Sequence, residues 1–431
     1  MQAIHLTLLF AAALLASLGL RLWLSTRQMR HVAAHRGAVP AAFVGKVSLE
    51  AHQKAADYTL AKGRFGLVSM AFGAVVLLGW TLLGGLDALN GVLRDAVAPR
   101  FGGLAYQLAL VLAFSVIGAV LELPFELYAT FRLEARFGFN RMTWQLFVRD
   151  LVTNTLVGIV LGLPIVALIL WLMGAAGAYW WCWAWLAWTA FGLFVQVVYP
   201  LVVMPLYNKF EPLPDGTLKE QALALMARCG FTAQGFYVMD GSKRSAHANA
   251  MFTGLGKSKR VIFYDTLINK LSPPEMEAVL AHELGHFKLR HLLKRSLTMT
   301  VLSLLAFALL GWLSNQAWFF LGLGVQPSLA APNDALALIL LMLAMPVFGV
   351  FAGPLAARVS RKHEFEADAY ACSQANGQDL AAALLKLHED NSTTLTPDPV
   401  YASFYYSHPP ATERLAALDS QARPQTHPQP S

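Results

Sequence analysis

Charged side chains are scarce in this sequence. Asp, Glu, Lys and Arg make up 14% of its 431 residues, against about 25% in soluble domains. Hydrophobic residues reach 56%, and between Ser296 and Ala357 there is no Lys or Arg at all. With a mean hydropathy of +0.48, the chain is not an ordinary soluble domain, and its composition predicts a membrane protein.

Cysteine is also rare. The three cysteines, Cys182, Cys229 and Cys372, show no C-x-x-C spacing, so the sequence indicates neither a paired-cysteine metal site nor a redox pair. Cys229 and Cys372 fall in segments that we place on the cytoplasmic side below, where disulfides are rare. We assign the three cysteines no role.

Long apolar runs are abundant instead. A helix needs about 20 apolar residues to cross a bilayer, and seven runs are long enough. They are residues 4–24, 66–86, 103–123, 151–173, 178–203, 299–321 and 335–357. The sequence therefore predicts a mainly α-helical polytopic membrane protein with seven transmembrane helices. We expect the first run to be an uncleaved span rather than a secretory signal, because Arg21, Arg27 and Arg30 crowd its far end and no Lys or Arg precedes it.

Basic residues are unevenly distributed between the loops. Residues 25–65 hold seven Lys and Arg, whereas the loop 87–102 has only Arg94 and Arg100. By the positive-inside rule, the loops after spans one, three, five and seven are cytoplasmic, so the N-terminus lies outside and the C-terminus inside. The net charge of +7 then reflects topology and attraction to anionic membrane lipids, and we expect no nucleic-acid partner.

The cellular location follows from broader features. The chain is compact, rich in Ala and Leu, and has no C-terminal ER-retrieval signal. We therefore expect an integral protein of the bacterial inner membrane.

Two segments, 204–298 and 358–431, are too polar to lie in lipid. We interpret them as two halves of one cytoplasmic domain. The last two spans, 299–357, separate the halves, and a five-span region, 1–203, precedes them.

The first polar segment combines helices with a small sheet. Residues 218–229 have the pattern of an amphipathic helix, GFYVMDGS indicates a strand, and NAMFTG and RVIFYD on either side of residues 256–259 indicate a β-hairpin. The sequence SPPE at 272–275 is a capping box with proline at the first helical position, which predicts a helix over 272–295. At the chain's end, ARPQTHPQPS is rich in proline, and we expect it to be disordered.

The capped helix carries AHELGH, in which His282 and His286 lie four residues apart with Glu283 between them. One helical turn separates the two imidazoles, so both can bind one metal ion, while Glu283 is rotated by about 100° from His282 and suits a base beside the metal. Neutral imidazoles suit Zn²⁺, and a catalytic zinc site keeps one position for water. The alternative is a surface helix with solvated histidines.

A third ligand has to come from elsewhere in the chain. The metzincin pattern is excluded, because Leu289 and Leu292 stand where that class needs Gly and His, and His291 is one residue out of register. Downstream, RKHEFEADAY places Glu364 and Asp368 four residues apart on a predicted helix. One of them can ligate zinc while the other braces a ligating imidazole. The alternative is a solvated charged helix face.

These motifs resemble one family when they are read in order. They are LPFELYATFRLEARFGFNRMT, LYNKFEPLPDGTLKE, SAHANAMFTGLGKSKRVIFYDTLI, AHELGHFKLRH, RKHEFEADAYA and YSHPPATERLAAL. In combination the chain resembles, over nearly its whole length, the type I CAAX prenyl proteases, which are integral-membrane zinc endopeptidases of the gluzincin kind. The resemblance implies a zincin-like metalloprotease domain and a large water-filled chamber within the membrane, with the zinc site at its cytoplasmic end.

The resemblance also implies roles for single residues. One Zn²⁺ would be held by His282, His286 and Glu364. Glu283 would be the general base, and Asp368 would support the site or donate a proton.

Helix geometry agrees with Glu364 as the third ligand. Glu366 points about 200° away from Glu364, and His363 is rotated from it by about 100°. Only Glu364 leaves Asp368 one turn along the same face, where it can accept the free N–H of a ligating imidazole.

Substrate contacts are implied for Asn249 and His408, either with the peptide backbone or with the oxyanion. The strand NAMFTG, if it lies at a sheet edge beside the site, could hold an extended peptide by strand addition. The alternatives are a turn role for Asn249 and a helix-start role for His408. Arg414 is a candidate partner for a carboxylate of the site.

We therefore predict a zinc-dependent endopeptidase, embedded in the membrane, that hydrolyses peptide bonds at the cytoplasmic face and is similar to CAAX prenyl proteases. Its substrate would be a peptide or protein, lipidated or not, because bacteria generally lack prenylated CAAX proteins. One alternative is a quality-control metalloprotease for misfolded or stalled polypeptides. Another is a non-enzymatic seven-span transporter or zinc-binding protein, which would have no use for a base at Glu283.

The Lys and Arg asymmetry yields a first testable prediction. Cysteine labels placed in residues 25–65 or in the C-terminal tail should be shielded from a membrane-impermeant reagent in intact cells, and a label at Gln326 should react. Permeabilised cells provide the control, because there all positions should react. The reverse pattern in intact cells would place the active site outside the cell.

Overall fold

Helices dominate the computed structural model of the chain, which describes all residues except 248–249, 254–257, 330 and 423–431. Seven helices, or runs of joined helical segments, are long and apolar enough to cross a membrane. The runs are α1 (Ala3–His35); α2 (Leu49–Trp80); α3 (Gly85–Tyr128) with η2 (Ala129–Glu134); α4 (Trp144–Val157) with η3 (Gly158–Gly162) and α5 (Leu163–Ala175); η4 (Gly177–Tyr179) with α6 (Trp180–Val198), η5 (Tyr199–Val203) and α7 (Met204–Tyr207); α11 (His291–Leu313); and α13 (Asp334–Gly349) with η7 (Val350–Ala352) and α14 (Gly353–Gln374). The predicted seven-span, mainly helical architecture is confirmed.

Two spans lie further towards the N-terminus than predicted. The second helix ends at Trp80 and the sixth at Leu313, whereas the apolar runs continue to residues 86 and 321. The excess apolar residues belong to the turn before α3 and to the short helix α12 (Ala317–Gly322). Apolar composition alone therefore overestimates how far these two helices extend.

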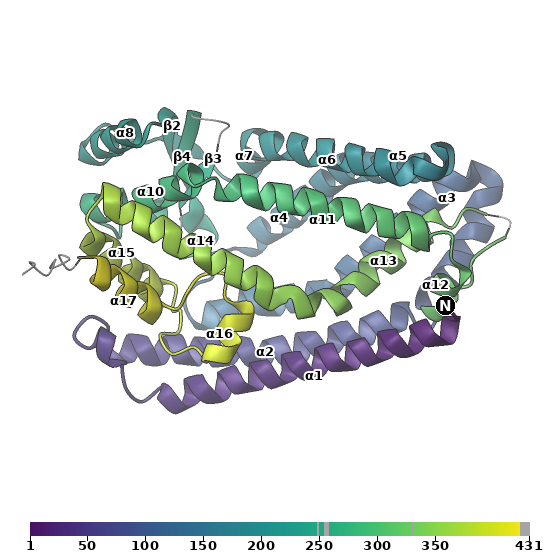
Figure 1. Cartoon of the computed structure of the whole chain (residues 1–431), viewed down its shortest axis with the longest axis horizontal. Helices are drawn as coiled ribbons and strands as arrows, with labels where there is room; N and C mark the ends of the chain where they lie inside the picture. The colour runs from purple at the N-terminus through teal and green to yellow at the C-terminus, as the bar shows by residue number, and fades with distance from the viewer. Residues whose placement is uncertain (248–249, 254–257, 330, 423–431) are drawn as a thin grey trace, which may run out of the picture.

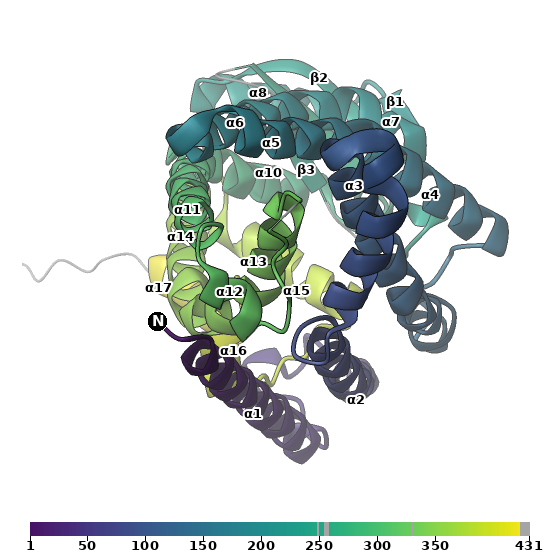
Figure 2. The same cartoon turned by 90° about the vertical axis from the view of Figure 1, so that its right-hand side faces the viewer.

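The spans are arranged around a buried centre. Figure 1 shows α1 and α2 running side by side along the molecule, and the view along the long axis in Figure 2 shows α13 surrounded by other spans. Apolar side chains from five helices fill this region and are at most 2% exposed. They are Phe10, Leu110, Leu170, Phe319 and Leu340.

A four-stranded sheet lies at one end of the molecule. It consists of β1 (Phe210–Pro212), β2 (Thr232–Met239), β3 (Ala250–Thr253) and β4 (Ser258–Tyr264), in the order β1-β2-β4-β3. The outer pairs are antiparallel, and β2 runs parallel to β4. The predicted hairpin is therefore confirmed as β3 and β4, and β3 is an edge strand.

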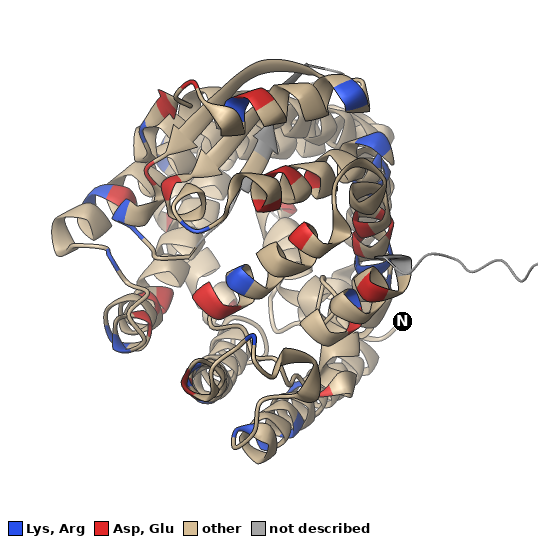
Figure 3. Cartoon of the chain, turned by 90° about the vertical axis from the view of Figure 1, so that its left-hand side faces the viewer, with Lys and Arg blue, Asp and Glu red and all other residues tan. Residues whose placement is uncertain are grey.

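Helices from both polar segments pack on this sheet around a second core. Its buried side chains include Leu225 of α8 (Thr217–Cys229), Phe263 of β4, Leu280 of α10 (Pro273–Lys288), Ala371 of α14 and Leu418 of α17 (Ala411–Ala422). One hydrophobic core thus joins residues that are separated by the last two spans. Figure 3 shows Lys, Arg, Asp and Glu spread over the elements at this end.

The remaining elements are short or lie at the edges of this core. They are α15 (Gly377–Asp390), α16 (Pro399–Tyr405), α9 (Asp265–Ile268), η1 (Ala41–Phe43) and η6 (Gly241–Lys243). The predicted disorder of the Pro-rich end falls almost wholly on 423–431, outside the described residues.

The helix that carries AHELGH differs from its prediction in one respect. Its capping box between Ser272 and Glu275 is present, but the expected single helix over 272–295 is wrong. The helix α10 ends at Lys288, Arg290 adopts the left-handed conformation with φ 58°, and α11 begins at His291. A left-handed residue breaks the helical path, so α11 leaves α10 in a new direction.

Candidate metal centre

The two helices that carry the site motifs, α10 and α14, approach each other closely at Gly285. A Cβ atom at this position would lie 3.1 Å from Tyr370 Cδ1 and 3.2 Å from both the Cα and the carbonyl oxygen of Ala367. Two of these neighbours are backbone atoms that cannot rotate away. The missing side chain of Gly285 therefore allows the two helices to come within reach of a common ion.

His282, His286 and Glu364 meet across this contact. The two Nε2 atoms lie 3.2 Å apart, and the Glu364 carboxylate oxygens lie 3.6 Å from His282 Nε2 and 3.4 Å from His286 Nε2. Ligands at 2.0–2.2 Å from a tetrahedral zinc ion stand about 3.3–3.6 Å from one another. Glu364 is 5% exposed, and its Oε2 is buried without a hydrogen-bond partner among the described residues. An orphaned carboxylate oxygen and this spacing fit a metal ion.

Asp368 and Arg414 support His282 from behind. His282 Nδ1 donates to Asp368 Oδ1 over 2.8 Å, and Arg414 donates to both oxygens of the same carboxylate from Nε and Nη2, at 2.8 and 2.5 Å. All three side chains are at least 93% buried. A carboxylate on the outer nitrogen fixes the tautomer and leaves Nε2 free for a metal. The contact that the helix geometry predicts between Asp368 and a ligating imidazole is present, as is the pairing of Arg414 with a site carboxylate.

A second chain of contacts supports His286. Its Nδ1 lies 3.0 Å from Nδ1 of His291, whose Nε2 lies 2.9 Å from Glu366 Oε2. With His286 Nε2 facing the metal position, Nδ1 donates to His291, which donates in turn to Glu366. The sequence analysis missed this role, because on an unbroken helix His291 would be rotated by about 140° from His286. The break in the helix at Arg290 instead brings the His291 side chain towards His286.

His363 and Glu366, the rival third ligands, gather around His291 instead. One potential ligand atom from each of these three residues lies within 4.8 Å of the other two, which raises the question of a second metal site. The rings of His291 and His363 are stacked, with centroids 4.1 Å apart and planes inclined by 11°. Imidazole lone pairs lie in the ring plane, so two parallel rings do not direct them at one ion between them. The cluster braces the first site.

Glu283 and His408 line one cavity of about 340 Å³, together with Tyr406 and Arg414. His408 Nε2 lies 3.5 Å from Glu364 Oε1, and its side chain is 65% exposed. A larger cavity of about 670 Å³ extends between α1 and α2 and shares four lining residues with the first, namely Asn391, Thr393, Thr394 and Tyr406. Asn249 lies outside the described residues.

The electrostatics of the metal-free site centre on His282. Burial alone would lower the pKa of His282, but the hydrogen bond with Asp368 and the nearby carboxylate of Glu364 outweigh it and raise that pKa to about 9. At neutral pH the two carboxylates thus favour a proton on the imidazole, where a metal ion would otherwise bind. A metal must displace that proton.

Comparison with known proteins identifies the family. The family described as CAAX prenyl protease N-terminal, five membrane helices, matches residues 28–209, and Peptidase family M48 matches residues 212–422. The chain belongs to the CAAX prenyl protease family. The family predicted by resemblance is therefore confirmed, and the protease is a membrane-embedded metalloendopeptidase that acts on peptides or proteins.

Individual relatives match the chain over most of their length. The protease is 34% identical to the CAAX prenyl protease 1 homolog of Arabidopsis thaliana, covering 89% of this chain and 91% of that protein. It is 32% identical to CAAX prenyl protease 1 of Saccharomyces cerevisiae, covering 88% of each. The crystal structure of S. mikatae Ste24p matches with a TM-score of 0.88 at 28% identity, covering 97% of this chain and 100% of that one.

These findings favour the protease over both alternatives, the quality-control enzyme and the non-enzymatic transporter. Metal dependence follows from the M48 family, and the integral membrane location from the family and the seven apolar helices. The relatives named here are eukaryotic, so they do not bear out a bacterial inner membrane, which stays a prediction.

The geometry predicts which substitutions remove the metal. Glu364→Ala should lose the ion during purification, because it deletes one of three ligands. Glu366→Ala and His363→Ala should keep it. Loss of a residue that only supports a ligand lowers metal affinity by about 10–100-fold, and a zinc site with apparent binding free energy of about 10–16 kcal/mol stays occupied after such a loss. Metal analysis of the three purified variants measures this. A metal-replete Glu364→Ala protein would mean that another residue is the ligand.

The raised pKa of His282 predicts an unusual pH dependence of metal binding. A proton competes with the metal below the pKa, so the affinity for zinc should fall by up to about tenfold per pH unit as the pH drops below about 9. An ordinary histidine would level off near pH 6.5. Competition with a calibrated chelator measures the curve. Asp368→Asn should move the plateau to lower pH, and a wild-type plateau near 6.5 would contradict the assignment.

Proposed function

We propose that the protease binds one zinc ion through His282, His286 and Glu364. The observation that carries this proposal is the convergence of three ligand residues, two of them buried, with atom separations of 3.2–3.6 Å and one carboxylate oxygen that has no hydrogen-bond partner among the described residues. Once bound, zinc supplies Lewis acidity, which polarises a peptide carbonyl and makes water acidic enough to act as a nucleophile at neutral pH.

In this proposal Glu283 is the general base. It follows His282 on α10 and lines the 340 Å³ cavity beside the ligands, where a peptide bond and a water molecule can both enter. Its carboxylate accepts a proton from the attacking water and passes it to the leaving amide nitrogen. Such proton transfers typically accelerate a reaction by about 10²–10⁴-fold.

His408 and Asp368 complete the catalytic set. His408 faces the same cavity and is largely exposed, so it can donate a hydrogen bond to the oxyanion that forms on the scissile carbonyl. Asp368 is buried between His282 and Arg414, which suits it to holding the imidazole rather than to touching substrate.

The substrate is proposed to bind as an extended chain beside β3. This strand is the outer strand of the sheet and pairs on one side with β4, so its other edge can accept main-chain hydrogen bonds from a peptide. Asn249, immediately before β3, is proposed to contact the substrate backbone. The names of the relatives make a prenylated CAAX chain the first substrate candidate and an unmodified polypeptide the second.

We further propose that the segments 204–298 and 358–431 form one protease domain at the cytoplasmic face. The shared hydrophobic core supports a single domain, and the Lys- and Arg-rich loop 25–65 supports the orientation. The bacterial inner membrane remains our predicted location, from composition alone.

Substitution of the proposed base tests the mechanism. Glu283→Gln should keep zinc at one ion per chain but lower peptide cleavage by at least about 10²-fold, because the amide cannot accept the proton. Cleavage should be measured on a prenylated CAAX peptide and on the same peptide without the prenyl group, each with and without chelator. Near-normal turnover of the metal-loaded variant would remove Glu283 from its role.

The wild-type protein in the same assay tests the substrate. Chelator should abolish cleavage of whichever peptide is cut, and zinc should restore it. Faster cleavage of the prenylated peptide supports a CAAX substrate, whereas equal cleavage of both supports a protease of unmodified chains.

A further inference from the structure

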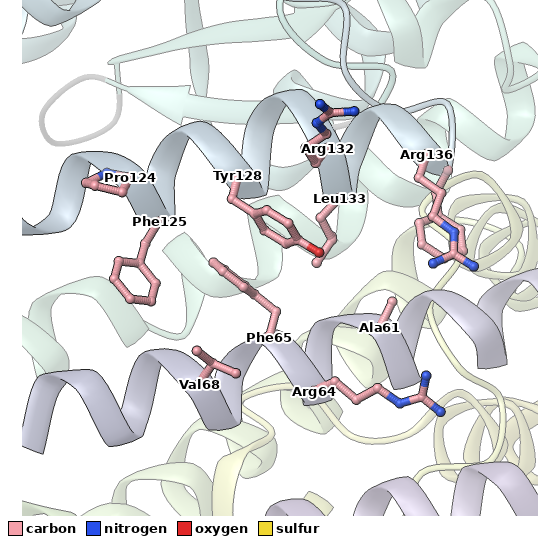
Figure 4. Close-up of a pocket in the computed structure, with 11 residues that line it drawn as sticks. Ala61, Arg64, Phe65, Val68, Pro124, Phe125, Tyr128, Arg132, Leu133 and Arg136 are labelled. Atoms are coloured by element: carbon pink, nitrogen blue, oxygen red, sulfur yellow. The ribbon is translucent and has the colours of Figure 1, made fainter.

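A groove of about 830 Å³ lies between α2 and the end of the third span, away from the residues of the metal centre. Figure 4 shows Phe65 and Val68 of α2 facing Phe125 and Tyr128 of α3 across it. The Phe65 ring stacks on Tyr128 with centroids 5.1 Å apart and lies 6.0 Å from Phe125. Aromatic contacts thus join the two helices and form the floor of an open apolar groove.

The groove is apolar at one end and positively charged at the other. Val68, Phe125 and Pro124 lie at one end, and the guanidinium groups of Arg64 and Arg136 lie at the other (Figure 4). Both arginines are exposed. A molecule that follows the groove would therefore meet an apolar surface first and positive charge last.

The positive end has little internal counter-charge. No Asp or Glu lines the groove, and among the described residues neither Arg64 nor Arg136 forms a direct ion pair. The Arg136 guanidinium lies 5.5 Å from the Phe137 ring centroid and interacts at longer range with Asp57, but that carboxylate is already bound by Arg36 through hydrogen bonds of 2.7 and 2.8 Å. Two exposed guanidinium groups without a direct ion pair, beside an apolar groove, suit an anionic head group on an apolar chain.

We propose that this groove is a binding site for an anionic phospholipid, whose acyl chain lies on the aromatic floor and whose phosphate pairs with Arg64 and Arg136. Arg64 precedes the apolar stretch of α2, and Arg136 ends the third helical run; the Lys and Arg distribution places both at the cytoplasmic interface. An acyl chain that points from there towards Val68 runs into the bilayer, which is the natural direction for a lipid. The site concerns residues outside the metal centre and does not depend on the proposed mechanism.

Photo-crosslinking tests this proposal on the full-length protein in phosphatidylcholine vesicles. A phosphatidylglycerol with a photoreactive acyl chain should crosslink to peptides from residues 61–68 and 124–137. Unlabelled phosphatidylglycerol should displace it at far lower concentration than unlabelled phosphatidylcholine does. Equal displacement by the two lipids, or crosslinks spread evenly over the spans, would overturn the proposal.

A charge variant with a matched control locates the head group. Each basic residue near an anionic lipid contributes about fivefold in affinity, so Arg64→Gln with Arg136→Gln should raise the displacing concentration of phosphatidylglycerol by about 25-fold. Arg30→Gln with Lys46→Gln removes the same charge from exposed residues outside the groove and should leave it almost unchanged. Equal losses in the two variants would assign the effect to general surface charge and refute the site.

A steric variant locates the acyl chain without changing charge. Val68 is 61% exposed and lines the groove, whereas Val75, two turns along the same helix, is 64% exposed and does not. Val68→Trp should fill the groove and abolish the crosslinks at 61–68 and 124–137, and Val75→Trp should preserve them. Undiminished crosslinking in Val68→Trp would show that the lipid lies elsewhere.

Discussion

The contact between α10 and α14 at Gly285 is the constraint on which the candidate site depends. It brings together ligands that lie almost 80 residues apart in the chain, with two membrane spans between them. A Cβ at this position would force its neighbours to move by a few tenths of an ångström. The capping box at Ser272 and the shared core hold α10 in place from its other sides. A shift of a few tenths of an ångström between these helices would change both separations between Glu364 and the two histidines at once.

Around this contact the two imidazoles are held by different hydrogen-bonding arrangements. His282 is backed by a buried carboxylate that Arg414 also holds, and His286 by a second imidazole that reaches the more exposed Glu366. The first arrangement favours protonation of His282 in the metal-free site. Together the two arrangements orient both Nε2 atoms towards one point, which a pair of freely rotating histidines would not do.

Regular local geometry made much of this predictable from sequence. Spacing of four on a helix places His282 beside His286 and Glu364 beside Asp368, and hydropathy alone reveals the seven spans. Irregular backbone and long-range packing were not predictable. The left-handed Arg290 reverses the direction of His291, which a helical wheel puts on the wrong side. The sequence singles out Arg414 as a partner for a site carboxylate, but that it binds Asp368 with both hydrogen bonds depends on the approach of α17 to α14, for which no local pattern exists.

The site is connected directly to the membrane spans. Glu364 belongs to the helical run Asp334–Gln374, in which the 3₁₀ segment η7 joins α13 to α14, and it stands seven residues beyond Ala357, where the apolar stretch ends. At 1.5 Å per residue along α14, the ligand lies at most about 10 Å from the edge of the hydrocarbon, a distance comparable with the thickness of the head-group layer. Because α11 begins just after the AHELGH helix, the other ligands are held at a similar depth. We propose that a rigidly held site near the interface favours a scissile bond that is itself tethered to the membrane over one in a freely diffusing folded protein.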